Sequence, residues 1–245
     1  GTGGWTFEAW RGVFYPPGLA QKRELEFASR ALTSIEINGT YYSTFKPESW
    51  RKWRDEAPDD FVFAVKASRY CTNRTTLAEA GPAIDRFLSQ GLTELGGKLG
   101  PINWQFMATK RFEPGDFAAF LSLLPKERDG LALRHALEVR HPSFATSAFY
   151  ELARRHGAAI VYANGKDVPE IDEATSDFTF ARLMSSSEDH AEGVADRDRR
   201  QIAEQARSWA KRGNVFIYFI AGAKVRNPAA AMSLIRELGG SGAKA

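Results

Sequence analysis

The stretch HALEVR, residues 135–140, begins like a buried β-strand and ends in charge. Side chains alternate between the two faces of a strand, so Leu137 and Val139 face one way while Glu138 and Arg140 face the other. Apolar strands with ionisable groups at their carboxyl ends are typical of α/β barrels, which build their sites at that end. We therefore asked whether other segments repeat this pattern.

Seven further apolar runs of strand length alternate with amphipathic stretches, and this alternation indicates parallel βαβ units. The expected strands are residues 2–5, 34–38, 61–67, 101–106, 136–140, 159–163, 178–183 and 215–219. The expected helices are residues 19–31, 47–56, 82–89, 114–124, 147–156, 198–211 and 228–238. Several of these begin with Pro or just after Asp or Ser, as helix N-termini do. The segment 164–177 is too short and too polar for a full helix, so the sixth βα unit should be degenerate.

These elements predict an α/β fold, a TIM-type (β/α)8 barrel of parallel strands. We expect one barrel domain at residues 1–238 and a flexible C-terminal tail at 239–245, GGSGAKA. The alternative is a doubly wound open sheet. It is disfavoured because GTGGW at residues 1–5 lacks the G-x-G-x-x-G pattern and ends in Trp where a dinucleotide-binding fold needs a helix start.

Composition sets limits on function and location. With 33 Lys plus Arg against 30 Asp plus Glu, the net charge is only +3, so the pI near 9.0 does not by itself indicate nucleic-acid binding. The single cysteine excludes an internal disulfide and fits a reducing compartment. No apolar run reaches the ~18–20 residues that span a bilayer. We expect a cytoplasmic protein without membrane contact. The chain begins at Gly1, and this expectation concerns the given residues alone.

Polar side chains recur late in the strands, on the parity expected to face the barrel interior. The ionisable members are Glu36, Lys66, Glu138, Arg140 and Arg182, and the expected rim adds Asn38, Arg69, Gln105 and His141. Burying an ion costs several kcal/mol unless the ion is paired. One explanation is an ion-pair network that plugs the barrel; the other, which we favour for the set as a whole, is a functional site.

Each residue type suggests a role. Glu36 and Glu138 are candidates for paired acid/base work, and Lys66 for a base or Schiff-base amine if its pKa is depressed. Three cations against two carboxylates favour an anionic substrate, which Arg140 and Arg182 would hold bidentately. Flat surfaces on which a sugar or base could stack are expected from Trp5, Tyr41, Tyr42 and Tyr218. The register of Trp104 instead places its side chain in the core, on the helix-facing side of its strand. Four scattered histidines give no metal-binding spacing, so we expect no metal and no cofactor.

The ordered motifs resemble a known family. GTGGW (1–5), WRGVFYPPG (10–18), EINGTYY (36–42), VKASR (65–69), KLGPINWQF (98–106), LRHALEVRHPSF (133–144), FARL (180–183) and VFIYF (215–219) are similar to the YecE-like family, domain of unknown function 72. The resemblance runs from Gly1 to Leu238 and implies a (β/α)8-type barrel of unsettled activity. It places Trp5, Trp10, Tyr15, Glu36, Asn38, Tyr42, Lys66, Arg69, Gln105, Glu138, Arg140, Arg182 and Tyr218 on motif positions.

Two departures from that family stand at the carboxyl ends of the last two strands. RLMSS at residues 182–186 replaces a pattern similar to RLHG, and YFIAGAKVRNP at 218–228 replaces one similar to YFNN. A polar His and Asn pair is thereby missing. Either Lys224, Arg226 and Asn227 substitute for it, or the substrate differs.

Three functions remain open at this point. The leading one is an enzyme, whether hydrolase, lyase or isomerase, that acts on a small anionic, sugar-like or phosphorylated molecule by metal-free acid/base chemistry. The second is a nucleic-acid-binding barrel, suggested by the arginine-rich segments 51–54 and 197–207. The third is a non-catalytic barrel that keeps a vestigial pocket. The sequence does not predict the oligomeric state.

Overall fold

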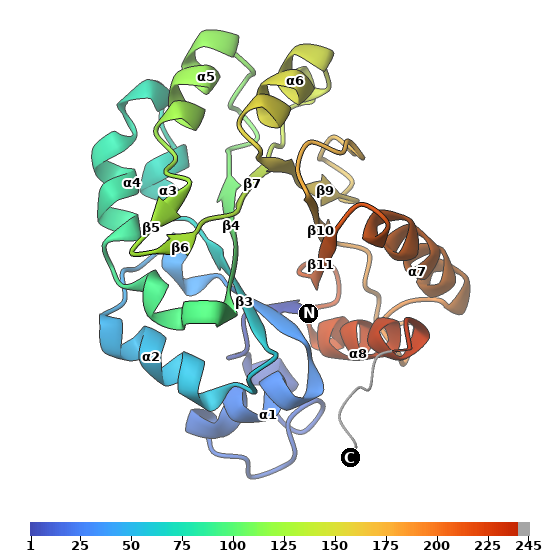
Figure 1. The fold of residues 1–245 in the computed structure, drawn as a ribbon. Coiled ribbons are helices and arrows are strands. Elements are labelled where there is room, and N and C mark those ends of the chain that lie inside the picture. The colour runs from blue at the N-terminus through green and yellow to red at the C-terminus, as the bar shows by residue number, and fades with distance from the viewer. Residues whose placement is uncertain (240–245) are drawn as a thin grey trace.

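The computed structural model describes residues 1–239 and contains a ring of parallel strands enclosed by helices (Figure 1). Apart from Gly239, the tail expected at 239–245 lies outside the described residues. No helix in the described part of the chain is long and apolar enough to cross a membrane.

The barrel strands follow the expected positions closely. They are β1 (Thr2–Gly3), β2 (Ser34–Ile37), β3 (Val62–Lys66), β4 (Leu99–Gln105), β7 (His135–Glu138), β8 (Ala159–Ile160), β9 (Tyr162–Ala163), β10 (Phe178–Leu183) and β11 (Asn214–Phe219). They form one parallel sheet in the order β8-β7-β4-β3-β2-β1-β11-β10-β9. Since β8 and β9 are two halves of one segment, separated only by Val161, this segment pairs with β7 on one side and β10 on the other and closes the ring. The predicted parallel barrel is confirmed.

The helices that enclose the ring are α1 (Glu24–Ala31), α2 (Pro47–Glu56), α3 (Arg69–Thr72), α4 (Gly81–Leu88), α5 (Pro114–Ser122), α6 (Ser147–Arg155), α7 (Asp196–Ala210) and α8 (Asn227–Glu237). All but the one-turn α3 were expected. Proline occupies the first turn of α2, α4, α5 and α8, where its missing N–H costs nothing. As predicted, residues 164–177 form no helix.

Short 3-10 helices complete the loops: η1 (Glu8–Trp10), η2 (Gln21–Arg23), η3 (Gly39–Tyr41), η4 (Leu77–Glu79), η5 (Leu92–Lys98), η6 (Pro142–Phe144) and η7 (Lys224–Arg226). An antiparallel hairpin of β5 (Glu127–Arg128) and β6 (Leu131–Ala132) precedes β7 and was not expected. Its turn holds Asp129 and Gly130, both with positive φ, so the Asp-Gly pair was a hairpin signal in the sequence.

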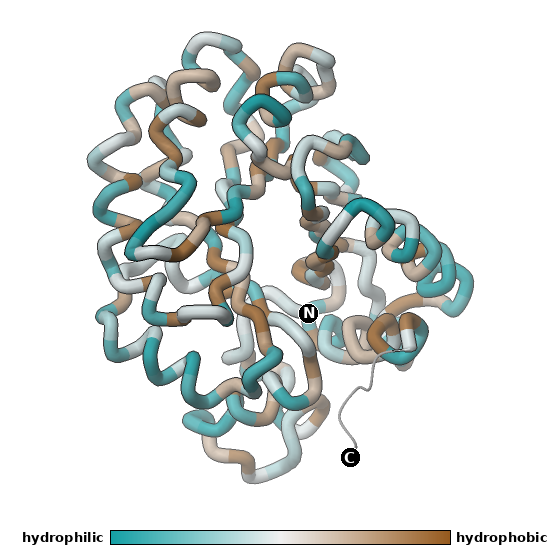
Figure 2. Tube along the Cα trace, viewed as in Figure 1, coloured by the Kyte–Doolittle hydropathy of each residue, from teal (hydrophilic) through white to brown (hydrophobic). Residues whose placement is uncertain are grey.

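The apolar side chains form two separate sets. The larger set lies between strands and helices; it includes Trp104, which is fully buried as its register predicted. The hydropathy view shows apolar segments along the strands and hydrophilic ones on the outer side of α7 (Figure 2). The smaller set lies on the inward parity of the strands and comprises Ala64, Ala136, Ala159, Val161, Phe178, Phe180 and Tyr218. We call this second set the inner apolar layer.

Candidate active site at the strand ends

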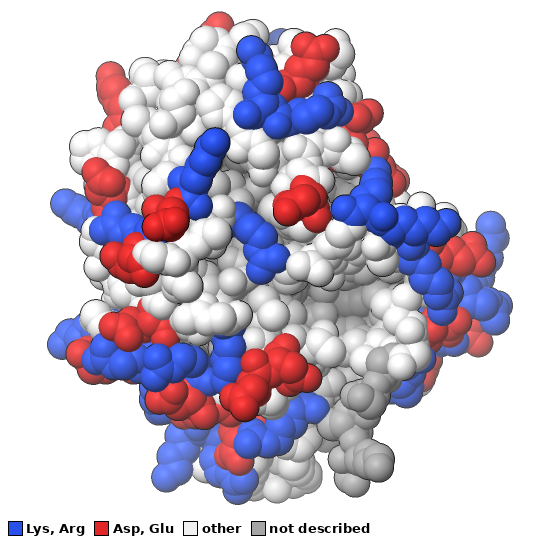
Figure 3. Space-filling model, viewed as in Figure 1, with Lys and Arg blue, Asp and Glu red and all other residues white. Residues whose placement is uncertain are grey.

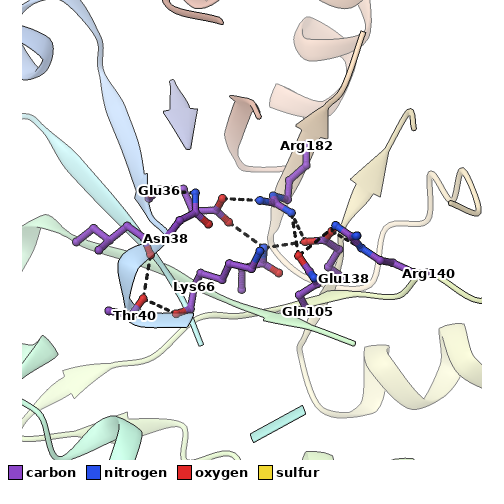
Figure 4. A network of polar contacts seen from close by, with 10 residues as sticks. Glu36, Asn38, Thr40, Lys66, Gln105, Glu138, Arg140 and Arg182 are labelled. Carbon is purple, nitrogen blue, oxygen red and sulfur yellow. Dashed lines mark hydrogen bonds and ion pairs between the residues drawn. The ribbon is translucent and has the colours of Figure 1, made fainter. Parts of the chain in front are cut away.

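Above the inner apolar layer, the same inward parity carries polar groups at the carboxyl ends of the strands. Glu36 is on β2, Lys66 on β3, Asn103 and Gln105 on β4, Glu138 on β7, Arg140 just beyond β7 and Arg182 on β10. We call these seven residues the strand-end cluster; all of them except Asn103 are labelled in Figure 4. The register brings them together, because Lys66 lies beside Asn103 and Gln105 beside Glu138 on adjacent strands.

Arg182 joins the two buried carboxylates. Its Nη2 lies 2.9 Å from Glu36 Oε2 and its Nη1 lies 2.5 Å from Glu138 Oε2. Asn103 connects the same pair, since its Nδ2 donates to Glu36 Oε1 at 2.8 Å and to Glu138 Oε2 at 3.0 Å. Arg182 is 3% exposed and both carboxylates are 0% exposed, so this is an enclosed ion-pair network. Such a network stabilises only when all its members are paired.

Arg140 extends the network toward solvent. Its Nη2 donates to Glu138 Oε1 at 2.7 Å and to Gln105 Oε1 at 3.1 Å, and its side chain keeps 30% of its surface exposed. Arg182, by contrast, has both terminal nitrogens committed to carboxylates. Of the two arginines expected to hold an anion, Arg140 is therefore the accessible one.

Lys66 differs from the other charged members of the strand-end cluster. Within the described residues, no carboxylate lies within ion-pair distance of its ammonium, which instead lies 4.7 Å from the centre of the Tyr41 ring. Burial lowers the pKa of Lys66 from 10.5 to about 8, and the positive charge of Arg182 acts in the same direction against the opposing Glu36 and Glu138. A sizeable fraction of the amine is thus neutral near physiological pH.

Glu138 has the opposite character. Burial alone would raise its pKa, but the charges of Arg182, Arg140 and Lys66 outweigh this effect and lower the pKa to about 2. The pKa of Arg182 is raised, because its two carboxylates outweigh its own burial. Glu138 therefore remains ionised at neutral pH and is suited to orienting cations rather than to donating a proton.

Unsatisfied polar atoms gather around the network. Within the described chain, Asn38 Oδ1, Asn103 Oδ1 and Arg182 Nε are buried and have no hydrogen-bond partner. A Cβ added to Gly3 would lie 2.6 Å from Asn38 Nδ2 and 3.7 Å from Glu36 Oε2, so a side chain at this position of β1 would displace the Asn38 amide. Buried polar groups without partners are uncommon, and they mark a place where a bound polar molecule or water would be stabilised.

The expected rim residues are spread more widely. Tyr42 is exposed and Arg69 lies against its ring, whereas Trp5 packs edge-on against Trp53 of α2. Tyr218 is fully buried within the inner apolar layer and shares a 2.6 Å hydrogen bond with Ser34. None of Trp5, Tyr42, Arg69 and Tyr218 forms a hydrogen bond with the strand-end cluster in the described structure.

His141 starts the turn after β7. Its Nδ1 accepts a hydrogen bond from the backbone N–H of Ser143 at the start of η6, so the predicted turn-capping role is confirmed.

Asn103 was not expected among the converging site residues, and Tyr41, which was expected to offer a flat surface to substrate, instead lies against the ammonium of Lys66. Asn103 shares the inward parity of Gln105 in INWQF, and that alternation was the available signal. Tyr41 follows β2 in η3, where Thr40 fixes the turn by donating to Lys66 O at 2.5 Å and to Ile37 O at 3.0 Å. Contacts between a 3-10 turn and a neighbouring strand leave no periodic signal in a sequence.

The structure shows where the residues lie that depart from the family motifs after β10 and β11. Ile220, where family members resemble Asn, lies beside Gly3 and packs against the inner apolar layer. Asn227 is buried and accepts a 2.6 Å hydrogen bond from Ser186, and Lys224 is exposed after β11. In the described structure neither Lys224, Arg226 nor Asn227 hydrogen-bonds the strand-end cluster, and the apolar residues Met184 and Ile220 occupy the positions of the polar pair.

The closed ring of parallel strands with polar groups at their carboxyl ends defines a (β/α)8-barrel protein of enzyme-like layout. The family model described as "Protein of unknown function DUF72" matches residues 1–245, and the chain belongs to this family.

Known proteins agree with this assignment. The UPF0759 protein YecE of Escherichia coli K12 is 26% identical over 199 residues, which are 80% of this chain and 66% of that protein. A DUF72 family protein of Thermotoga maritima superposes with a TM-score of 0.75 at 22% identity, covering 97% of each chain. One from Enterococcus faecalis gives 0.73 at 17% identity, covering 89% of this chain and 94% of its own.

A D-psicose 3-epimerase from Clostridium cellulolyticum, solved with D-tagatose, also superposes. Its TM-score is 0.56 at 12% identity over 94% of each chain, so the likeness concerns the barrel fold alone.

Proposed function

We propose that this protein is an enzyme acting on a small anionic molecule, with Lys66 as the group that takes up a proton and Arg140 as the partner of the anion. The observation that carries the proposal is the unpaired ammonium of Lys66, whose pKa is lowered to about 8 amid otherwise paired ions. A general base works best when its pKa lies near the working pH.

The roles differ from those the residue types alone suggest. Arg182 and Asn103 hold Glu36 and Glu138 in place, and Glu138 in turn positions Arg140. Arg140 is the part of this network that reaches solvent, so it meets the carboxylate or phosphate of the substrate. The neutral amine of Lys66 then accepts a proton from the bound substrate and becomes the ammonium, which Glu36 and Glu138 stabilise at longer range.

The nucleic-acid alternative receives less support from the surface. In the segment 51–54, Arg51 pairs with Glu48 and Glu94, and Arg54 pairs with Asp55. In the segment 197–207, Arg199 pairs with Glu192, Asp196 and Glu237. On the face shown in Figure 3, positive and negative side chains are interspersed. Nucleic-acid binding would require a larger area of one sign.

A ligand screen tests the proposal. Wild-type protein and Arg140→Ala are heated with millimolar phosphosugars and small carboxylates, and a ligand at about 100 times its Kd should add about 2.7 kcal/mol of stability to the wild type only. Arg197→Ala, which removes an exposed arginine, is the matched control and should respond like the wild type. If no compound stabilises the wild type more than Arg140→Ala, the anion-binding role fails.

The role of Lys66 has its own test with any compound found in this way. Deuterium exchange from the compound into water, followed by NMR, should rise with pH to a midpoint near 8 and be lost in Lys66→Met. Adding borohydride with a carbonyl-containing compound asks whether Lys66 instead forms an imine with loss of water. Exchange that is unchanged in Lys66→Met would contradict the proposal.

A further inference from the structure

A cavity lies outside the strand-end cluster, between the loop that follows β2 and the helices α3 and α4. Its volume is about 550 Å³, and its lining includes Thr40, Tyr42, Tyr70, Arg74, Arg86 and Gln90. This volume is within the range of about 300–1,000 Å³ typical of small-molecule sites. No residue of the strand-end cluster lines it.

The cavity is positively charged. Arg74 and Arg86 line it, and no Asp or Glu does. The guanidinium of Arg86 is exposed and makes no ion pair or hydrogen bond with any described residue, while that of Arg74 uses one Nη1 donor on the carbonyl of Glu79. Guanidinium groups with free donors are suited to binding a phosphate or another oxyanion.

Two tyrosine rings stand at the same cavity. Tyr42 and Tyr70 are 67% and 63% exposed, among the most exposed large side chains with apolar surface in the described structure. The guanidinium carbon of Arg69 lies 5.8 Å from the centre of the Tyr42 ring and 5.4 Å from that of Tyr70, so one cation steadies both rings. Exposed rings held in this way offer their faces for stacking with a planar heterocycle.

We infer that this cavity binds a nucleotide, with its phosphate on Arg74 and Arg86 and its base against Tyr42 or Tyr70. Hydroxyl groups of Ser43, Thr44 and Ser68 in the lining supply hydrogen-bond partners for the ribose. The inference does not depend on the chemistry of Lys66, because the two sites share no lining residue.

Calorimetric titration with adenosine 5′-monophosphate, adenosine and inorganic phosphate tests the inference on the full chain. The nucleotide should bind about tenfold or more tightly than either of its parts, since stacking and phosphate contacts each contribute at least that factor. Arg74→Gln/Arg86→Gln should weaken nucleotide binding about tenfold or more while leaving adenosine binding unchanged, and Tyr70→Ala should weaken both.

Arg197→Gln/Arg200→Gln removes the same two positive charges from exposed positions on α7 and should bind like the wild type, and so should Lys66→Met. Circular dichroism confirms that each variant is folded. Titration with a single-stranded tetranucleotide shows whether the ligand is a free nucleotide or part of a strand. If the tetranucleotide binds more tightly than adenosine 5′-monophosphate and depends equally on Arg86, the cavity holds one nucleotide of a strand. Phosphate binding as tightly as the nucleotide, or nucleotide binding that is absent or insensitive to the arginine variants, overturns the inference.

Discussion

The barrel interior is filled in two contrasting ways. In the inner apolar layer, Phe180 and Tyr218 lie with ring centres 5.1 Å apart among alanine, valine and phenylalanine side chains. One layer higher, two carboxylates and an arginine are buried together. The lower layer shows that packing alone can fill this ring. A buried ion network is often no more stabilising than apolar residues of equal volume, and we therefore propose that the polar layer serves binding rather than stability.

The largest expected effect comes from breaking the polar layer at its centre. Arg182→Met leaves Glu36 and Glu138 buried without the cation that they share, and should lower the free energy of unfolding by about 3–5 kcal/mol at pH 7. Phe180→Ala in the inner apolar layer should cost about the same, through a cavity. Urea denaturation of both variants measures the two losses.

The stability losses of Arg182→Met and Phe180→Ala should depend differently on pH. Glu138 has its folded pKa lowered to about 2, so its contribution is present above its unfolded value of about 4.3 and is lost as pH falls toward 2. Arg182→Met lacks this contribution, so its deficit should shrink between pH 5 and 3, whereas that of Phe180→Ala should not. Glu36→Gln/Glu138→Gln/Arg182→Met should recover much of the loss. Equal deficits at both pH values would mean that the carboxylates are not coupled to Arg182.

Much of this contrast could be predicted from the sequence. The alternation in HALEVR and FARL placed Glu138, Arg140 and Arg182 on the inward parity, and the recurrence of strands and helices predicted the barrel. Which cation pairs with which carboxylate could not be predicted, because pairing depends on the stagger between strands and on side-chain rotamers. The isolation of Lys66 is therefore a structural result: it arises because Arg182, from a strand far away in the sequence, occupies both carboxylates.

The second, smaller effect is the change in the free energy of unfolding when Lys66 is replaced. Its sign distinguishes a functional site from an ion-pair network that only fills the barrel. An ammonium whose pKa is lowered destabilises the fold at pH 7, so Lys66→Met should raise the free energy of unfolding by about 1–2 kcal/mol. Between pH 8 and 10.5 the unfolded chain keeps a proton that the folded chain has lost. Wild-type stability therefore rises relative to Lys66→Met over that range, and the gain of the variant disappears.

Lys98→Met is the matched control for this lysine. Its ammonium donates to the carbonyls of Arg54 and Ala57 at 2.7 Å each, so its removal should destabilise the fold by about 1–3 kcal/mol. Chemical denaturation at pH 7 compares the two variants directly. If Lys66→Met loses stability as Lys98→Met does, Lys66 is a structural member of the network. That result would favour the interpretation of a non-catalytic barrel with a vestigial pocket.

The smallest effect tests the boundary between the two layers. The Tyr218 hydroxyl bonds Ser34 at 2.6 Å, and because Ser34 donates its own proton to Val62 O at 2.7 Å, Tyr218 is the donor. Burial raises the pKa of Tyr218, so the hydroxyl keeps its proton across the stable pH range. Tyr218→Phe should cost about 1 kcal/mol in urea denaturation, against about 0.5 kcal/mol or less for the exposed Tyr42→Phe. The sequence predicted that Tyr218 contacts substrate. That prediction would hold if Tyr218→Phe left stability unchanged but removed the thermal shift caused by an anionic ligand. The ligand would then reach below the strand-end cluster, and the two layers would form one site.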